Sequence, residues 1–324
     1  MSTIKVNSIE SASGGGVAAK IASVNDGQLS HRNLIINGAL QVWQRGTSTT
    51  SSGAYQADRF WMAFASQYQR STDAPNGFVY SAKLTYGSSD FAFGQPIELV
   101  EQGNMSPLVQ GEEVTLSFYA KTDSGSEAFR SIMFFRNSKF DSTNQSQFSA
   151  SSGSSETFTA TTSWQRFSCT YTVPAINSSN TILAFEIANM SRTMYITGLQ
   201  LELGPVMTSF EHKRKAVELT ACQRYYVKYI QQGVSGYIES SAATTAQLTH
   251  PIPVRMRTNP SCTCTTASAI GVDRGGLYGI NSTAGNLGWA YENNLNVGWA
   301  MDVARNRWHT TWCRVQNVQF DAEL

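Results

Sequence analysis

The sequence predicts an all-β protein: a jelly-roll β-sandwich, then a short helix, then a second, C-terminal β-sandwich domain. Three observations predict this. Apolar residues recur at every second position in short runs, which Ser, Thr, Asn and Gly separate. Two matched segments, residues 33–46 and 196–205, have the form of the first and last strands of one sandwich. Only 15% of the residues are charged, so uncharged polar residues, typical of strand faces and turns, provide much of the polar surface.

Residues 1–32 differ in character from the rest of the chain. Ile4, Val6 and Ile9 alternate with polar residues, and a glycine run follows at 14–16. The segment is too short and too rich in glycine to form a core of its own. Two interpretations stay open: a disordered N-terminus, and a leader that docks onto another virion component through the three apolar residues. We favour the docking leader, because those residues are unusual in a pure linker.

The predicted first domain, residues 33–211, contains a series of alternating runs. Each run places one set of side chains in a core and the other in water, as in a half-buried strand. The runs cover residues 60–64, 78–85, 114–121, 166–173 and 198–203. Because no helical pattern interrupts them, they indicate a sandwich or jelly roll. A long exposed loop is predicted for the Ser- and Thr-rich residues 141–162.

A connector helix is predicted over residues 212–224. Ala216, Leu219 and Cys222 recur on one side at helical spacing, whereas Glu218 falls on the other side with the lysines. The segment lies between two β-rich regions, so we interpret it as the link between domains.

Residues 225–324 predict a second β domain that is long enough to form its own core. Aromatic residues crowd its last part, and two of them, Trp289 and Tyr291, would share one face of a strand. Aromatic faces stack on sugar rings, so we predict a receptor- or glycan-binding surface here. Its candidate residues are Trp289, Tyr291, Trp299, Arg274, Asn296 and Asp302. The alternative is that the tryptophans are core or subunit-interface residues, since they carry large apolar area.

Patterns typical of catalytic or metal-binding sites are missing from the sequence. The 4 histidines are far apart, without HxH or HExxH spacing, and no Gly-x-Ser-x-Gly elbow occurs. The acids of the terminal domain form no evident pair for glycoside hydrolysis. The 5 cysteines contain no CxxC pair, and we interpret them as mostly buried apolar fillers. We therefore predict a protein that is not an enzyme, with no catalytic residues and no metal ligands.

The net charge and the hydropathy of the chain argue against two classes of partner, nucleic acids and membranes. The net charge is +1, so no overall field favours nucleic acid. The first residues lack the apolar core of a signal peptide, and no stretch approaches the ~18 apolar residues of a membrane span. We expect no nucleic-acid partner and no membrane insertion, and we expect assembly in a host cytoplasm.

Most of the chain resembles a known family. The leader Met1–Ile9 is similar to the leaders of bacteriophage tail-fibre or virion-fibre proteins of marine and cyanobacterial phages. A second part resembles a carbohydrate-binding-module-like jelly roll, through Asn33–Gly38, Ala57–Trp61, Gln95–Glu98, Val114–Lys121, Trp164–Ser168 and Gly198–Gly204. A third part resembles the helix and distal β domain that follow in such fibres, through residues 218–226, 253–257 and 259–260.

The resemblance implies a homotrimeric component of the virion that contacts the host surface. Jelly rolls of this kind sometimes hold a structural Ca²⁺ through an acidic residue on the last strand. Here that strand carries Glu202 between leucines, with Gln200 where a second acid would stand. We therefore expect no cofactor, and structural calcium stays an open alternative.

We predict a structural virion fibre protein that attaches to a host-surface glycan or protein. In this prediction residues 1–32 dock to the virion, residues 33–211 form a shaft module and residues 225–324 form the receptor-facing tip. Two alternatives remain: a capsid or tail decoration protein without a receptor role, and a glycan depolymerase. The chain lacks the repeated rungs of a β-helix spike, which argues against the depolymerase.

Overall fold

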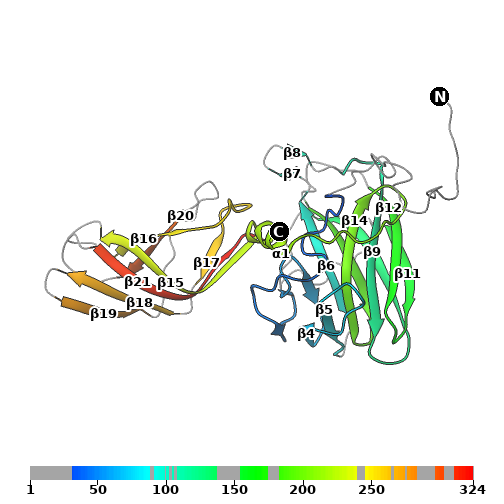
Figure 1. The fold of residues 1–324 in the computed structure, drawn as a ribbon, viewed down its shortest axis with the longest axis horizontal. Helices are drawn as coiled ribbons and strands as arrows, with labels where there is room; N and C mark the ends of the chain where they lie inside the picture. The colour runs from blue at the N-terminus through cyan, green and yellow to red at the C-terminus, as the bar shows by residue number, and fades with distance from the viewer. Residues whose placement is uncertain are drawn as a thin grey trace, which may run out of the picture.

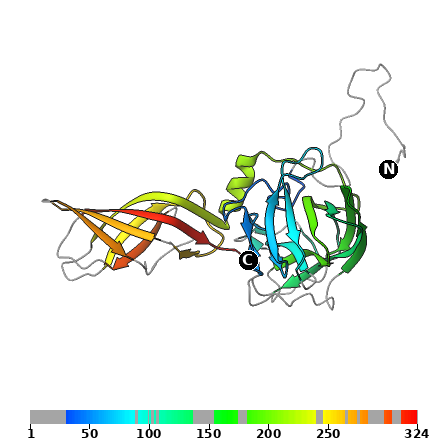
Figure 2. The same cartoon turned by 90° about the horizontal axis from the view of Figure 1, so that it is seen from below.

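A computed structural model shows two β lobes joined beside a single short helix (Figure 1). The structure describes residues 31–87, 91–98, 100–101, 104–105, 108–136, 154–173, 182–238, 245–263, 266–273, 276–282, 296–302 and 310–323. Both views place the N-terminal sandwich at one end and the C-terminal sheet at the other (Figures 1 and 2). The predicted all-β fold, with a jelly-roll sandwich and one short helix, is confirmed.

Two six-stranded antiparallel sheets form the N-terminal lobe. The first sheet has the order β1-β4-β5-β14-β9-β12, with the bounds Ser48–Thr49, Gln67–Ser71, Ser81–Thr85, Met194–Leu203, Glu113–Thr122 and Gln165–Thr172. The second sheet has the order β11-β10-β13-β6-β3-β2, with the bounds Ser154–Ala160, Glu127–Arg136, Ile182–Met190, Phe91–Glu98, Trp61–Ala63 and Ala54–Tyr55. A small hairpin, β7 (Val100–Glu101) and β8 (Asn104–Met105), stands apart from both sheets. The loop predicted over residues 141–162 is wrong in part, because β11 lies within it.

One apolar core fills the space between the two sheets. Phe118 in β9 and Phe129 in β10 lie with ring centroids 6.0 Å apart, and Phe158 lies 5.7 Å from Phe129. Elsewhere in the core Phe60 and Phe93 are stacked at 5.0 Å. Full burial of a phenylalanine side chain stabilises a fold by about 1.5–3 kcal/mol, so these rings hold the sheets together.

Residues 33–46 lie against the last strand, β14, but they are not a strand as the sequence predicted. The Leu199 N–H donates to the Gly38 carbonyl at 2.9 Å, and a Cβ on Gly38 would lie 2.1 Å from the Leu199 oxygen. At Asn37 the backbone turns with a φ of 62°, and the Asn37 side chain donates to the carbonyls of Val42 and Asp58. The segment is therefore a turn fixed by its own side chains.

Helix α1 spans Lys215–Gln223, within the predicted connector. Cys222 is buried as predicted, but Glu218 is only 5% exposed although the helical pattern placed it on the polar side. The reason is a specific partner: the Glu218 carboxylate accepts a hydrogen bond from the Asn37 N–H at 2.7 Å. Burial raises the pKa of Glu218, and this hydrogen bond opposes the shift. No helix of the described residues is both long and apolar enough to cross a membrane.

The described strands of the C-terminal lobe are hydrogen-bonded into a single sheet, whereas the sequence predicted a β-sandwich here. Its order is β19-β18-β21-β15-β16-β20, with the bounds Gly276–Ser282, Thr266–Asp273, Thr310–Asp321, Tyr226–Ile238, Thr245–Pro251 and Asn296–Asp302. Strand β17 (Ser261–Thr263) also pairs with β21. The long strands β15 and β21 pair from Tyr226 opposite Asp321 out to Tyr237 opposite Thr310, so they form a common centre to which the other strands add.

Ion pairs fasten the base of the C-terminal lobe to the sandwich. Arg45 contacts Asp321 at 2.8 Å and Glu323 at 3.3 Å. Arg59, only 1% exposed, also forms an ion pair with Glu323 and donates to the Pro96 carbonyl at 2.6 Å. Charges buried in this way require partners, so the C-terminal carboxylates complete the environment of both arginines.

Two tyrosines pack against the arginines of this junction. The Arg45 guanidinium lies 3.6 Å from the Tyr226 ring centroid, and that of Arg59 lies 3.6 Å from the Tyr225 ring centroid. The Tyr225 hydroxyl donates to Glu98 at 2.9 Å, and Arg224 contacts the same carboxylate at 3.2 Å. The end of α1 and the start of β15 are therefore docked on the second sheet.

Candidate functional site

The two outer faces of the sandwich differ in what covers them. Around β3 and β6 in the second sheet, Trp61 and Ala92 belong to an apolar cluster that includes Tyr225 from the junction. Trp61 is 1% exposed and Tyr225 is 4% exposed, so this part of the second sheet is closed by the C-terminal lobe. The first sheet instead carries half-buried aromatic, charged and amide side chains on its outer face.

Five of these side chains form a row across neighbouring strands. Strand register places Tyr195 opposite both Lys121 and Lys83, and Lys83 opposite Gln69. Trp164 precedes β12, and its ring centroid lies 5.6 Å from the Lys121 ammonium. We call Trp164, Lys121, Tyr195, Lys83 and Gln69 the binding row. Because neighbouring strands lie about 4.8 Å apart, the row is about 20 Å long, enough for several sugar rings.

Tyr195 is the centre of the binding row. Its ring meets the ring of Trp164 edge-on, at 6.5 Å between centroids and 74° between planes. The ammonium groups of Lys121 and Lys83 lie 5.0 Å and 5.7 Å from its centroid. All four side chains are half-buried, so they are partly fixed by the protein and partly open to a ligand. Aromatic surface with a few convergent polar groups is typical of small-ligand sites.

Asp73 orients two members of the binding row. Its carboxylate contacts the Lys121 ammonium at 2.5 Å and accepts a hydrogen bond from the Trp164 indole at 3.0 Å. Burial alone would raise the pKa of Asp73, but the hydrogen bonds from Lys121 and Trp164 and the Lys121 charge outweigh it and lower the pKa. Asp73 therefore stays ionised at neutral pH and holds both side chains in place.

A packed aromatic cluster borders the binding row. Phe78 lies 5.4 Å from Tyr119, 4.9 Å from Phe210 and 5.1 Å from His212, measured between ring centroids. This cluster anchors the loop after β4, which carries both Phe78 and Asp73. The loop that orients Trp164 is therefore itself fixed to the sheet.

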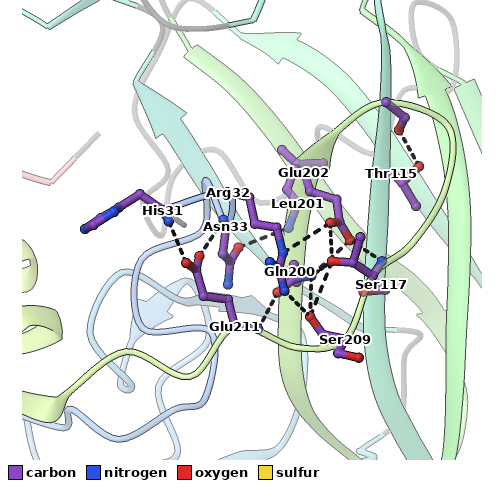
Figure 3. Close-up of polar contacts among 12 residues, drawn as sticks. His31, Arg32, Asn33, Thr115, Ser117, Gln200, Leu201, Glu202, Ser209 and Glu211 are labelled. Atoms are coloured by element: carbon purple, nitrogen blue, oxygen red, sulfur yellow. Dashed lines mark hydrogen bonds and ion pairs between the residues drawn. The ribbon is translucent and has the colours of Figure 1, made fainter. Parts of the chain in front are cut away.

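A polar network fills the other end of the same outer face (Figure 3). Thr208 donates to Glu202 from its N–H at 2.9 Å and from its hydroxyl at 2.6 Å. Gln200 donates to the same carboxylate at 2.9 Å and accepts from the Glu211 N–H at 2.7 Å. Glu211 in turn accepts from the backbone N–H groups of His31 and Asn33. The network ties the first described residues and residues 208–211 to β14.

This network does not fit a structural Ca²⁺. Both oxygens of Glu202 accept hydrogen bonds from N–H or O–H donors, and the Arg32 guanidinium lies 3.7 Å from one of them. Calcium requires six to eight oxygen ligands, whereas these neighbours offer donors and a positive charge. Within the parts of the chain that the structure describes, no group of three or more His, Cys, Asp or Glu side chains is gathered for a metal ion.

The site residues predicted from the sequence are only partly placed. Asn296, Trp299 and Asp302 lie in β20, which ends the C-terminal sheet. Trp289, Tyr291 and Arg274 lie outside the described residues, as do the leader residues Ile4, Val6 and Ile9. The C-terminal candidates therefore stay predictions. Of the cysteines, Cys169 and Cys222 are free and buried as predicted.

The binding row is a site that the sequence did not predict. A signal was present, because Lys83 and Lys121 occupy outward positions of runs whose alternate residues were assigned to the core. What the sequence could not supply was the strand order β5-β14-β9-β12. That order, together with β4 beside β5, brings side chains from five separate segments into one line.

Residues 60–192 match the family model described as "Carbohydrate binding domain". The matched residues contain Lys83, Lys121 and Trp164, together with Asp73, and end just before Tyr195. No curated protein matches the sequence.

Several solved structures are similar to the sandwich. A CBM4 domain is 17% identical, with a TM-score of 0.33, over 52% of this chain and 98% of that one. The CBM22-1 xylan-binding domain of Paenibacillus barcinonensis Xyn10C is 11% identical, with a TM-score of 0.34, over 57% of this chain and 100% of that one. The enzymatically active domain of tailspike protein 4 of bacteriophage CBA120 is 16% identical, with a TM-score of 0.32, over 53% of this chain and 22% of that one.

Proposed function

We propose that the N-terminal sandwich binds a glycan along the binding row. The observation that carries this proposal is the pairing of Trp164 and Tyr195 on one open sheet face, with Trp164 held by Asp73. The family match over residues 60–192 supports a carbohydrate as the ligand class. In this proposal the two rings provide apolar platforms, and the lysines and Gln69 bond to hydroxyl or charged groups of the sugar.

The arrangement suits recognition of a chain of sugars in a repeating orientation. Trp164 and Tyr195 come from strands two apart on the row, and their ring centroids lie 6.5 Å apart. Polar groups lie on both sides of Tyr195, so a ring stacked there would meet donors at two edges. Because the platforms are oriented before binding, little side-chain freedom is lost when the ligand arrives.

Affinity electrophoresis of the full chain in gels that contain soluble polysaccharides tests this function. We expect at least one polysaccharide to retard the protein, and Trp164→Ala and Tyr195→Ala each to weaken that retardation about tenfold or more. Tyr86→Ala is the matched control: Tyr86 is a 36% exposed tyrosine at the end of the same sheet, and strand alternation places it off the row. Equal retardation of all three variants, with unchanged thermal melting, would overturn the proposal.

We further propose that this glycan binding serves attachment of a virion to its host surface. The sequence resemblance to phage fibres supports this role, together with a leader, residues 1–32, of the kind expected to dock onto another virion protein. Three copies in a homotrimer would combine weak single contacts, with a gain of about 10²–10⁴ in avidity when the geometry permits. The proposed role is binding without catalysis and without a cofactor.

Particle experiments separate this role from its rivals. Virions that carry Tyr195→Ala should adsorb to host cells more slowly than virions that carry Tyr86→Ala. A label on the protein that locates it on the particle head, with normal adsorption after its removal, would favour the decoration protein. Shortened polysaccharide chains after incubation with the purified protein would favour the depolymerase.

The C-terminal lobe is the competing location for the receptor site. The double variant Trp289→Ala, Tyr291→Ala in the full chain tests it beside the row variants. Loss of glycan binding in the double variant, with binding retained in Tyr195→Ala, would move the site from the sandwich to the C-terminal lobe.

A further inference from the structure

We propose that the ligand of the binding row is an acidic polysaccharide whose carboxylate pairs with Lys83. This inference rests on the glycan-binding function proposed above and names its substrate class. The two lysines that flank Tyr195 differ in whether a carboxylate neutralises them.

The two lysines have different charge partners. Lys121 contacts the Asp73 carboxylate at 2.5 Å, and its side chain is 16% exposed. Lys83 lies 5.7 Å from the Tyr195 ring centroid. Within the described residues it has no carboxylate at ion-pair distance. The charged groups along the row are therefore two ammonium groups and one carboxylate, which leaves one positive charge without a counterpart.

The position of Lys83 makes this charge relevant to a ligand. Lys83 stands between Tyr195 and Gln69 in the strand register, so a sugar ring stacked on Tyr195 would cover its ammonium. Covering the ammonium group removes its water, so the ligand must replace those hydrogen bonds. The hydroxyls of a neutral glycan would offer only neutral acceptors, whereas a carboxylate on the sugar would pair with the charge and add a stronger, charge-assisted hydrogen bond.

Asp73 limits the positions on the row at which a ligand carboxylate is favoured. It neutralises Lys121 at one side of Tyr195 and would repel a second ligand carboxylate placed there. The row therefore favours one acidic group next to Lys83 and hydroxyl groups next to Lys121 and Trp164. A uronic-acid-containing chain, with one carboxylate on a ring otherwise bearing hydroxyls, has this chemistry.

Calorimetric titration of the full chain tests the inference. The ligands are polygalacturonate, alginate and hyaluronan, and each is used before and after methyl esterification. Esterification removes the charge and keeps the backbone. We expect at least one acidic polymer to bind, its ester to bind about tenfold more weakly, and the acidic form to lose affinity as salt is raised.

Lys83→Met removes the charge and keeps the aliphatic stem. It should weaken binding of the acidic polymer by about the same factor as esterification and have a much smaller effect on binding of the ester. Lys215→Met is the control, because Lys215 is an exposed lysine at the start of α1; it should bind as the wild type does. Equal losses in both variants would assign the effect to overall charge and overturn the inference.

The failure of this inference differs from the failure of the function on which it rests. Tyr195-dependent binding of a neutral polysaccharide, unaffected by Lys83→Met, would overturn the acidic ligand and leave the glycan-binding function standing. Absence of binding to every polymer, acidic and neutral, would overturn both.

Discussion

Glu323 forms an ion pair with Arg59 across 264 residues of sequence, and both side chains are buried. Arg59 lies in the turn before β3, and Arg45, which also pairs with Glu323, lies before β1, so both segments are joined to the end of the C-terminal lobe. The lobe that closes part of the second sheet is therefore held by charges inside the junction as well as by apolar packing.

Removing the Glu323 charge should destabilise the protein strongly. In Glu323→Gln, Arg59 and Arg45 would remain buried with one carboxylate fewer, and breaking a buried pair in this way costs about 3–5 kcal/mol. Asp321→Asn is the comparison, because the Asp321 side chain is 37% exposed and Arg45 keeps its second partner, Glu323, so the loss of stability should be smaller than in Glu323→Gln. Urea unfolding monitored by tryptophan fluorescence measures both, and equal shifts would contradict the importance assigned to burial.

Asp58 should make stability depend on pH between about 4 and 6. Burial raises the pKa of Asp58 to about 6, against the opposing hydrogen bonds from Gln44. The folded protein therefore holds the Asp58 proton more tightly than the unfolded chain, in which the pKa is near 3.9. The resulting contribution to the free energy of unfolding, about 3 kcal/mol, is fully present below about pH 3.9 and is lost as the pH rises through 6. Asp58→Asn cannot titrate, so the stability of the wild type relative to this variant should fall over that range. Free energies of unfolding of the wild type and the variant that change with pH by the same amount would contradict the prediction.

Gly38→Ala should be among the most damaging single substitutions in the chain. The new Cβ would meet the Leu199 carbonyl oxygen at 2.1 Å, and both groups are backbone-fixed, so the turn must move off β14. Gly111→Ala is the control: its φ is +85°, but nothing lies within 4 Å of its Cβ, so it should cost only about 1–2 kcal/mol. The yield of soluble protein and the thermal midpoint of the two variants compare them directly.

Asp73→Asn should weaken ligand binding more than it weakens the fold. The amide keeps the size of the carboxylate but cannot pair with the Lys121 ammonium, and its bond with the Trp164 indole is weaker. We expect about a threefold to tenfold loss of affinity for the ligand of the binding row. The thermal midpoint should change little, because Asp73 is 45% exposed. A large loss of stability with unchanged affinity would show that Asp73 supports the fold instead of the site.

The sequence predicted strands in which apolar and polar residues alternate along the chain and missed β6. Strands β5, β9, β12 and β14 each overlap a predicted alternating run, although β14 is buried along most of its length. Strand β6 escaped detection because seven of its eight residues are buried, so no polar face marks its period. Its outward residues Ala92 and Gly94 are small: Ala92 belongs to the cluster with Trp61 and Tyr225, and a Cβ on Gly94 would lie 2.1 Å from the Phe185 carbonyl oxygen of the neighbouring strand β13.

The remaining errors come from contacts between distant segments. The turn at Asn37 depends on hydrogen bonds to Val42 and Asp58, and the burial of Glu218 depends on that same turn. The periodicity of a short stretch of sequence cannot predict the contacts with Asp58 and Glu218, because both residues lie far from Asn37 in the chain. The binding row is hidden for the same reason, since its members come from separate strands that only the fold aligns.

The pairing of β15 with β21 begins at the junction, with Tyr226 opposite Asp321, and both strands run outward from it (Figure 1). At these inner ends Arg45 forms an ion pair with Asp321 and Arg59 with Glu323. The same two guanidinium groups lie against the rings of Tyr226 and Tyr225 at the start of β15. Two arginines of the sandwich therefore fix both central strands of the C-terminal sheet at one place.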